Sequence, residues 1–305
     1  MDRGKLKLIK TVKGSLYALN RYRLPYLFLL PTIVILSVLL IAPIFSGIYM
    51  SFQKTSLRGT TEFVQFQNYR FLFNESRFIN NVTRSLLYVI GNLSLSLPLA
   101  YTAALLVTRK LESMRFFRAI FLLPWIIAPV VSAVLFKSLV DPSFGPLTLL
   151  LGKITGSNPV ILADSNLALL TVIGHSFWRS FPFMMLFLAA GIVTIPPEFY
   201  EAAKVDGAGP WTQFRYVTLP LTRIHLAIVL LIITMWTVQD AETIYALTQG
   251  GPGYGTEVTA VRLFKESFVN FDLNTGATIG VVLIVVSVIF MAIYLKLVGR
   301  TEYLQ

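Results

Sequence analysis

The chain has 305 residues, of which 55% are hydrophobic and only 13% are charged, and its formal net charge is +11. A typical soluble domain has about 25% charged residues, so this composition excludes an ordinary water-soluble globular protein. It also excludes a disordered chain, which requires low hydrophobicity. With no cysteine and only two histidines, we expect neither disulfides nor a structural zinc site, and no metal-ligand set.

The chain opens with a basic segment, residues 1–23, which contains seven Lys and Arg residues against a single acidic residue, Asp2. Apolar residues recur in this segment at partly helical spacing. We interpret it as an amphipathic helix on the inner membrane surface, with a disordered basic tail as the alternative.

Six apolar segments follow, each close to the ~20 residues that a membrane-spanning helix needs. Prolines within several of them predict kinks, which neighbouring helices can tolerate by satisfying the freed carbonyl groups. We therefore expect an all-α polytopic membrane protein, with a six-helix domain over residues 24–298 and a short tail, 299–305. In chain order the expected spans are Leu24–Phe45, Ser85–Val107, Ala119–Leu139, Leu167–Val193, Ile224–Ala241 and Gly276–Val298.

The distribution of positive charge predicts the orientation of these spans. The two tails and the alternate loops between them hold 16 of the 26 Lys and Arg residues. Because basic loops stay in the cytoplasm, we expect both termini and the loop 194–223 to be cytoplasmic.

The loop 194–223 carries the strongest local pattern. Two prolines followed by two glutamates predict a short helix, since proline suits the first turn and anions suit the positive end of the helix dipole. Gly207 is predicted to end this helix, and a second helix is predicted to run from Pro210 to Pro220. Such a helix–turn–helix would present a firm protrusion to a cytoplasmic partner.

This loop resembles the cytoplasmic loop of ABC-importer permeases, with Glu-Ala-Ala, then Gly, then Leu-Pro at fixed spacing. Val217 departs mildly from the isoleucine usual in the family. The extended pattern resembles the carbohydrate-uptake branch, and the block Leu247–Pro252 resembles the outer segment of the maltose-permease-type first subunit, here in a compact six-span form. The resemblance implies that the coupling residues are Glu201, Ala202, Ala203, Asp206, Gly207, Leu219 and Pro220.

The resemblance also implies an architecture and a set of partners. The expected fold is the type I ABC-importer permease fold, in the cytoplasmic membrane of a prokaryote. The chain has no phosphate-binding loop of its own, so it is expected not to be an enzyme and to have no catalytic residue. ATP and Mg are expected on two partner ATPase subunits. A second permease subunit, an extracytoplasmic solute-binding protein and a sugar substrate are the other implied partners, and no nucleic acid is expected.

Polar residues within spans are costly and therefore mark candidate pathway residues. The densest group ends the fifth span, where the maltose-permease family lines its sugar site, with asparagines in place of Gln239 and Asp240. Helix–helix hydrogen bonding, including pairing of Arg179 with Asp240 and packing by Asn92, is the alternative. The predicted pathway residues are Trp236, Gln239, Asp240, Thr243, Tyr245, His175, Arg179 and Asn92.

The leading hypothesis is therefore the membrane-spanning half of an ATP-driven sugar importer that works by alternating access. The same machinery importing glycerol phosphate or a polyol derivative is the first alternative, because Arg179 suits a phosphate. A channel or secondary carrier that needs no ATPase is the second. An intramembrane enzyme would need paired acids, a Ser/His pair or a metal set inside the spans.

Overall fold

The computed structural model describes residues 23–56, 59–108, 114–156 and 160–299. The predicted amphipathic helix in the N-terminal segment and almost all of the predicted tail therefore lie outside the described residues. The chain divides into two compact units, Met1–Met50 and Ser51–Gln305.

The described part of the first unit is helical. Helix α2 (Arg23–Leu36) continues through a π-helical turn, η1 (Ser37–Ile41), into α3 (Ala42–Ser51). The run Leu27–Ser51 is long and apolar enough to cross a membrane. The first predicted span is confirmed, although the helix continues six residues beyond the expected end at Phe45.

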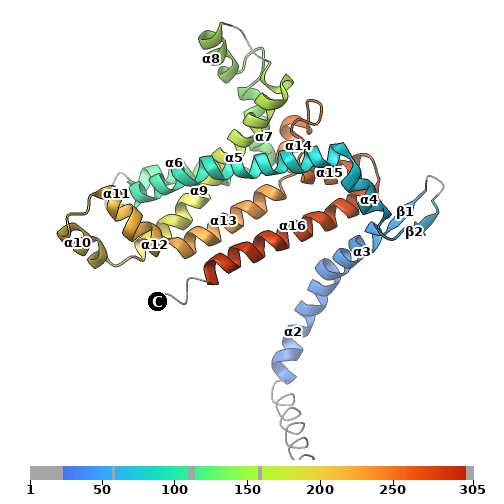
Figure 1. Cartoon of the computed structure of the whole chain (residues 1–305), viewed down its shortest axis with the longest axis horizontal. Coiled ribbons are helices and arrows are strands. Elements are labelled where there is room, and N and C mark those ends of the chain that lie inside the picture. The colour runs from blue at the N-terminus through green and yellow to red at the C-terminus, as the bar shows by residue number, and fades with distance from the viewer. Residues whose placement is uncertain (1–22, 57–58, 109–113, 157–159, 300–305) are drawn as a thin grey trace, which may run out of the picture. The chain divides into compact units, whose positions relative to one another are not determined.

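The second unit is built on long helices that lie side by side (Figure 1): α5 (Ser76–Val107) packs along α9 (Ser165–Val193), and α13 (Arg223–Val238) packs against both α9 and α16 (Leu273–Gly299). A two-stranded antiparallel hairpin pairs β1 (Gln53–Thr55) with β2 (Thr61–Phe63). The remaining elements are α4 (Gln67–Asn74), α6 (Met114–Ile126), α7 (Pro129–Leu139), α8 (Pro146–Thr155), η2 (Ile161–Ala163), α10 (Pro197–Val205), α11 (Pro210–Gln213), η3 (Phe214–Thr218), α12 (Leu219–Leu221), α14 (Glu242–Thr248), α15 (Thr259–Phe264) and η4 (Lys265–Val269).

Across the described residues, four helices are long and apolar enough to cross a membrane, and six spans result if each of two bent helix pairs counts as one. On that count the six predicted spans are confirmed, with corrected ends. The second begins nine residues earlier than expected, at Ser76.

Two predicted spans are not single straight helices. The third is bent by 108° between Ile126 and Pro129, because Ala128 precedes a proline and is held out of the helical region, at ψ 139°. The fifth ends as a helix at Val238 instead of Ala241, and a 71° bend separates it from α12.

The two ends of this unit differ in what they carry. Helices α10 to α12 lie at one end, together with the last turns of α5 and α16, whereas α4, α14, α15 and the hairpin lie at the other (Figure 1). Within this unit, the loop 194–223 thus lies at the same end as the last described turns of α5 and α16, as the Lys and Arg counts predict. Which end faces the cytoplasm stays a prediction.

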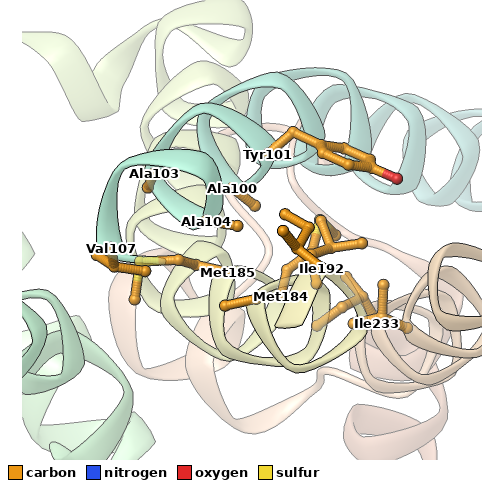
Figure 2. Packing of buried hydrophobic residues seen from close by; sticks show 12 residues of the cluster. Ala100, Tyr101, Ala103, Ala104, Val107, Met184, Met185, Ile192 and Ile233 are labelled. Carbon is orange, nitrogen blue, oxygen red and sulfur yellow. The ribbon is translucent and has the colours of Figure 1, made fainter. Parts of the chain in front are cut away.

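Small residues allow the long helices to approach closely. Ala100 and Ala104 of α5 are fully buried and face Met184 and Met185 of α9 (Figure 2). Alanine at a helix interface lets the backbones approach, which favours packing where no hydrophobic effect drives helix association. Ile233 of α13 completes this cluster, so three helices share one apolar core.

An ionic cluster that the sequence did not reveal stabilises the end of the unit that carries α4, α14 and α15. The fully buried carboxylate of Glu257 accepts two hydrogen bonds from Arg77, at 2.8 and 2.9 Å, one from Lys265 at 2.8 Å and one from Asn81 at 3.0 Å. Beside it, Arg262 pairs with Glu75. The cluster joins the start of α5 to the segment between α14 and η4.

The balance of interactions on Glu257 favours the charged form. Burial raises the pKa of its carboxyl, but hydrogen bonds from Arg77, Lys265 and Asn81 outweigh burial and bring the pKa from the ordinary 4.5 to about 2. A carboxyl with a lowered pKa in the folded state contributes stability above its unfolded pKa, and that contribution is lost as the pH falls from about 4.5 through about 2.

Replacing Glu257 should therefore destabilise the fold. Glu257→Gln leaves two cations without their buried partner, and we expect a loss of about 3–5 kcal/mol at neutral pH, measured by thermal unfolding in detergent. The control, Glu62→Gln on the exposed strand β2, should stay within about 0.5 kcal/mol. The difference in stability between wild type and Glu257→Gln should become smaller as the pH falls from 4.5 to 2. An equal difference at pH 3 and pH 7 would contradict the lowered pKa of Glu257.

Candidate functional site

A cavity of about 470 Å³ opens beside the point where α13 ends. Its wall comes from α9, the end of α13 and the segment that follows it, with single residues from α6 and α15. The lining residues are Trp125, His175, Ser176, Arg179, Ser180, Ile233, Trp236, Thr237, Gln239, Asp240, Ala241, Glu242 and Phe264.

The cavity lies at an interruption of the helix. Helix α13 ends at Val238 and α14 begins at Glu242, so the three residues between them belong to neither helix. Irregular backbone at membrane depth is tolerated where it is covered by protein or borders a water-filled space. The interruption thus places polar side chains and backbone groups at the cavity wall.

Asp240 stabilises this interruption. One carboxylate oxygen accepts a hydrogen bond from the Tyr88 hydroxyl of α5 at 2.7 Å, and the other accepts one from the Thr243 backbone N–H at 3.2 Å. The second bond satisfies a donor in the first turn of α14, which has no partner within its own helix. Asp240 therefore both lines the cavity and fixes the relation of α5 to the interruption.

Arg179 is the cation of the cavity. It forms no ion pair with any carboxylate among the described residues, Asp240 included, and its Nε is buried without a hydrogen-bond partner. The alternative in which Arg179 pairs with Asp240 is therefore wrong for this structure. A cavity guanidinium that forms no ion pair within the described part of the chain is available to a ligand.

His175 lies one helical turn before Arg179 and is nearly fully buried. Its Nε2 hydrogen-bonds the Ser132 hydroxyl at 2.9 Å, and its ring packs edge-on against Phe136, with centroids 4.8 Å apart. Its Nδ1 is buried without a partner. The Nε2 atom is thus hydrogen-bonded within the protein, whereas Nδ1 forms no hydrogen bond with any described residue.

Asn92 belongs to a buried network behind the cavity wall. Its amide nitrogen donates to Thr237 Oγ1 at 2.9 Å, and its carbonyl oxygen accepts hydrogen bonds from Ser96 at 3.0 Å and from Ser180 at 2.9 Å. Asn92 does not itself line the cavity, but Thr237 and Ser180 do. The network joins α5, α9 and α13 at the depth of the cavity.

The structure brings five of the eight predicted pathway residues together at the cavity: His175, Arg179, Trp236, Gln239 and Asp240. Thr243 is buried beside it, and Tyr245 packs on Phe264 with ring centroids 4.9 Å apart. Sequence reasoning missed Ser176 and Ser180, although their spacing of four residues parallels that of His175 and Arg179. It also missed the lining residues contributed by other segments, Trp125 and Phe264.

This wall suits a polar, hydroxyl-rich molecule. The Trp236 and Trp125 rings both pack on Phe183, with centroids 4.8 and 5.5 Å away. Aromatic faces can cover the apolar side of a ring-shaped ligand, while hydroxyl, amide and charged groups fix its orientation.

The predicted helical loop is confirmed as α10, followed by α11, η3 and α12. Gly207 ends α10 with φ +77°, and the Ala208 N–H bonds the Ala203 carbonyl at 2.8 Å while the Gly207 N–H bonds that of Lys204 at 3.0 Å. This pair of bonds is a Schellman cap, which needs a left-handed residue. Pro220 does not end the second helix, because α12 continues one residue further, to Leu221.

The coupling residues predicted from the motif divide by exposure. The side chains of Glu201, Ala202 and Asp206 are exposed, Ala203 is half-buried, and no residue of α10 is buried. Leu219 is half-buried and packs against the apolar core, whereas Pro220 is exposed. Helix α10 thus lies at one end of the unit with most of its surface free for contact.

Comparison with known proteins identifies the family. A family model described as "Binding-protein-dependent transport system inner membrane component" matches residues 72–303. The chain is 32% identical over 285 residues to the probable ABC transporter permease protein YurN of Bacillus subtilis, covering 90% of this chain and 95% of that protein.

Two other relatives carry named substrates. The trehalose/maltose transport system permease protein MalF of Thermococcus litoralis is 30% identical over 281 residues, covering 91% of this chain and 94% of that protein. The sn-glycerol-3-phosphate transport system permease protein UgpA of Agrobacterium fabrum is 27% identical over 279 residues, covering 91% and 95%.

Solved structures share the fold. A chain from a bacterial ABC transporter involved in the import of the acidic polysaccharide alginate superposes with a TM-score of 0.79 at 22% identity, over 95% of this chain and 99% of that one. The expected importer-permease fold and the family expected from the loop motif are both confirmed. The chain belongs to the inner membrane components of binding-protein-dependent transport systems.

Proposed function

We propose that this chain is the membrane-spanning subunit of an ATP-driven importer for a sugar or oligosaccharide. The observation that carries the proposal is the polar cavity at the interruption between α13 and α14, with the exposed helix α10 at one end of the same helical unit. Tryptophan rings beside hydroxyl, amide and charged groups suit a carbohydrate. The relative named for trehalose and maltose supports the same substrate class.

Helix α10 is the proposed coupling element. Glu201 is exposed and, as a carboxylate, can accept charge-assisted hydrogen bonds from a partner. In this proposal two ATPase subunits bind the α10 end, carry ATP and Mg, and close on nucleotide binding. The movement of α10 then switches the cavity from one side of the membrane to the other. The conformation of the loop 194–223 depends, in this proposal, on Asp206, Gly207, Leu219 and Pro220.

The remaining partners follow from the family. The family consists of components of binding-protein-dependent transport systems, and a structural relative was crystallised with a periplasmic protein carrying an alginate pentasaccharide. We propose that a solute-binding protein delivers substrate to the end opposite α10, and that a second permease subunit of related fold completes the pathway. The α10 end and both termini are then cytoplasmic.

Glycerol phosphate or a polyol derivative is the second candidate substrate. The specific observation in its favour is Arg179, a cavity cation with no ion pair among the described residues. One relative is named for sn-glycerol-3-phosphate.

The proposed function is tested by isolating the chain with its partners and measuring uptake in proteoliposomes. The proposal requires that ATPase subunits co-purify and that uptake stops when ATP is depleted. Uptake that persists without ATP would instead support a channel or secondary carrier.

Removing the cavity cation should reduce transport. Arg179→Gln should lower uptake efficiency by about tenfold or more, because a charge-assisted hydrogen bond to the ligand is lost. The matched control is Arg84→Gln, which removes a half-buried arginine of α5 that does not line the cavity. In this variant, uptake of a phosphorylated substrate should fall more than uptake of a neutral sugar. Unchanged uptake of both would remove Arg179 from the pathway.

The left-handed residue that ends α10 should be needed for coupling. Gly207→Ser places a side chain at φ +77°, which costs about 1–2 kcal/mol; we therefore expect roughly tenfold less substrate transported per ATP hydrolysed. The control is Gly209→Ser, two residues away, where φ is an ordinary −69° and serine is a favoured helix cap. Equal coupling in the two variants would contradict the role of the Gly207 turn.

A further inference from the structure

Hydrogen bonds link four hydroxyl-bearing residues from α10 to α5, and at Thr218 the link passes from the side-chain hydroxyl to the backbone carbonyl. The Tyr200 hydroxyl of α10 lies 3.0 Å from Thr218 Oγ1 at the end of η3. The Thr222 hydroxyl donates to the Thr218 carbonyl at 2.7 Å and lies 2.7 Å from the Tyr101 hydroxyl of α5. We call these four residues the hydroxyl relay.

The directions of these bonds can be partly assigned. A threonine hydroxyl has one hydrogen and two acceptor lone pairs. Because the Thr222 hydrogen is donated to the Thr218 carbonyl, the Tyr101 hydroxyl must donate to Thr222 Oγ1. The Thr222 hydroxyl is therefore both a donor, to Thr218, and an acceptor, from Tyr101.

The relay is shielded from water over most of its length. Thr218, Thr222 and Tyr101 are all buried, and only Tyr200 is half-buried. The Tyr101 ring packs edge-on against Phe214, with centroids 5.4 Å apart, and Phe214 in turn packs on Trp211 at 5.5 Å. Hydrogen bonds in such surroundings are stronger, and an unpaired hydroxyl is more costly, than at the surface.

The backbone between α10 and α13 changes direction twice, so side-chain hydrogen bonds are needed to hold α10 in a fixed position relative to the long helices. Gly207 reverses the chain, and a 71° bend at Thr222 separates α12 from α13. No residue of α10 is buried. Among the described residues, Tyr200 makes the only side-chain hydrogen bond that joins α10 to the rest of the protein.

The far end of the relay leads to the cavity. Tyr101 is on the same continuous helix as Asn92 and Tyr88, about 14 and 20 Å away along its axis at 1.5 Å per residue. Asn92 bonds Thr237 and Ser180 of the cavity wall, and Tyr88 bonds Asp240 at the helix interruption.

We propose that the hydroxyl relay is a positioning element that ties α10 to α5, and that α5 carries displacement of α10 to the cavity. The relay rests on the proposed coupling function of α10. It assigns a role in transport to Tyr200, Thr218, Thr222 and Tyr101, none of which contacts the cavity. Its members act through α5 and do not touch substrate.

The test compares Thr222→Val with Thr222→Ser in the full transporter complex. Valine has the shape of threonine without the hydroxyl, whereas serine keeps the hydroxyl. We measure uptake and ATP hydrolysis in the same proteoliposomes. Thr222→Val should transport at least fivefold less substrate per ATP, with ATP hydrolysis within twofold of wild type, and Thr222→Ser should retain more than half of the wild-type ratio.

A second variant protects the test against misfolding of the first. Tyr200→Phe keeps the half-buried ring and removes only the hydroxyl at the α10 end, and it should lower the same ratio. Wild-type ratios in both Thr222→Val and Tyr200→Phe would overturn the relay. Equal losses in Thr222→Val and Thr222→Ser would also overturn it, since the hydroxyl would then not be the cause.

Failure of the proposed function itself gives a different result. If the wild-type chain does not bind an ATPase subunit, or if its uptake is independent of ATP, the coupling role of α10 is wrong. If wild-type uptake depends on ATP, and the variants transport as much substrate per ATP as the wild type, the relay alone is wrong.

Discussion

The close packing of α5 against α9 and α13 is the contact on which the rest of the helical unit depends. Alanines of α5 face methionines of α9 and allow a short helix separation. That separation lets one fully buried side chain, Asn92, bond to both neighbouring helices at once. Because unpaired polar groups in an apolar interior are costly, this network fixes the three helices in one register and sets the depth of the cavity.

The interruption between α13 and α14 follows from the same constraint. A break in a spanning helix leaves backbone groups without helical partners, and these must be satisfied by nearby protein or by water. Asp240 meets part of this need through Thr243, and Tyr88 of α5 holds Asp240 in turn. Polar groups therefore gather at one place between the apolar helices, together with the Arg179 guanidinium, which forms no ion pair among the described residues. The proposed transport cycle uses that place as its substrate site.

Much of this arrangement could be predicted from the sequence, for identifiable reasons. Apolar runs near 20 residues locate the spans, and Gly207 predicts the end of α10 because few other residues accept a positive φ. The early start of α5 could not be predicted, since Arg77 and Asn81 look unsuited to a span until Glu257, 180 and 176 residues away, is seen to bond them. The partner of Asp240 was hidden likewise, because Tyr88 lies 152 residues away. Local patterns indicate which residues are polar, but only tertiary packing determines their partners.

The central claim is that the cavity changes sides when α10 is moved by its partners, and the absence of cysteine from the chain allows a direct test. Gln239→Cys would place a single thiol in the cavity, and Phe271→Cys would place one on an exposed loop at the end opposite α10. Each is labelled with a membrane-impermeant maleimide from either side of proteoliposomes that contain the full complex. We predict that Gln239→Cys labels from the α10 side without nucleotide and from the opposite side when the ATPases are trapped closed, while Phe271→Cys always labels from the opposite side. Labelling of Gln239→Cys from the same side in both states would contradict the account.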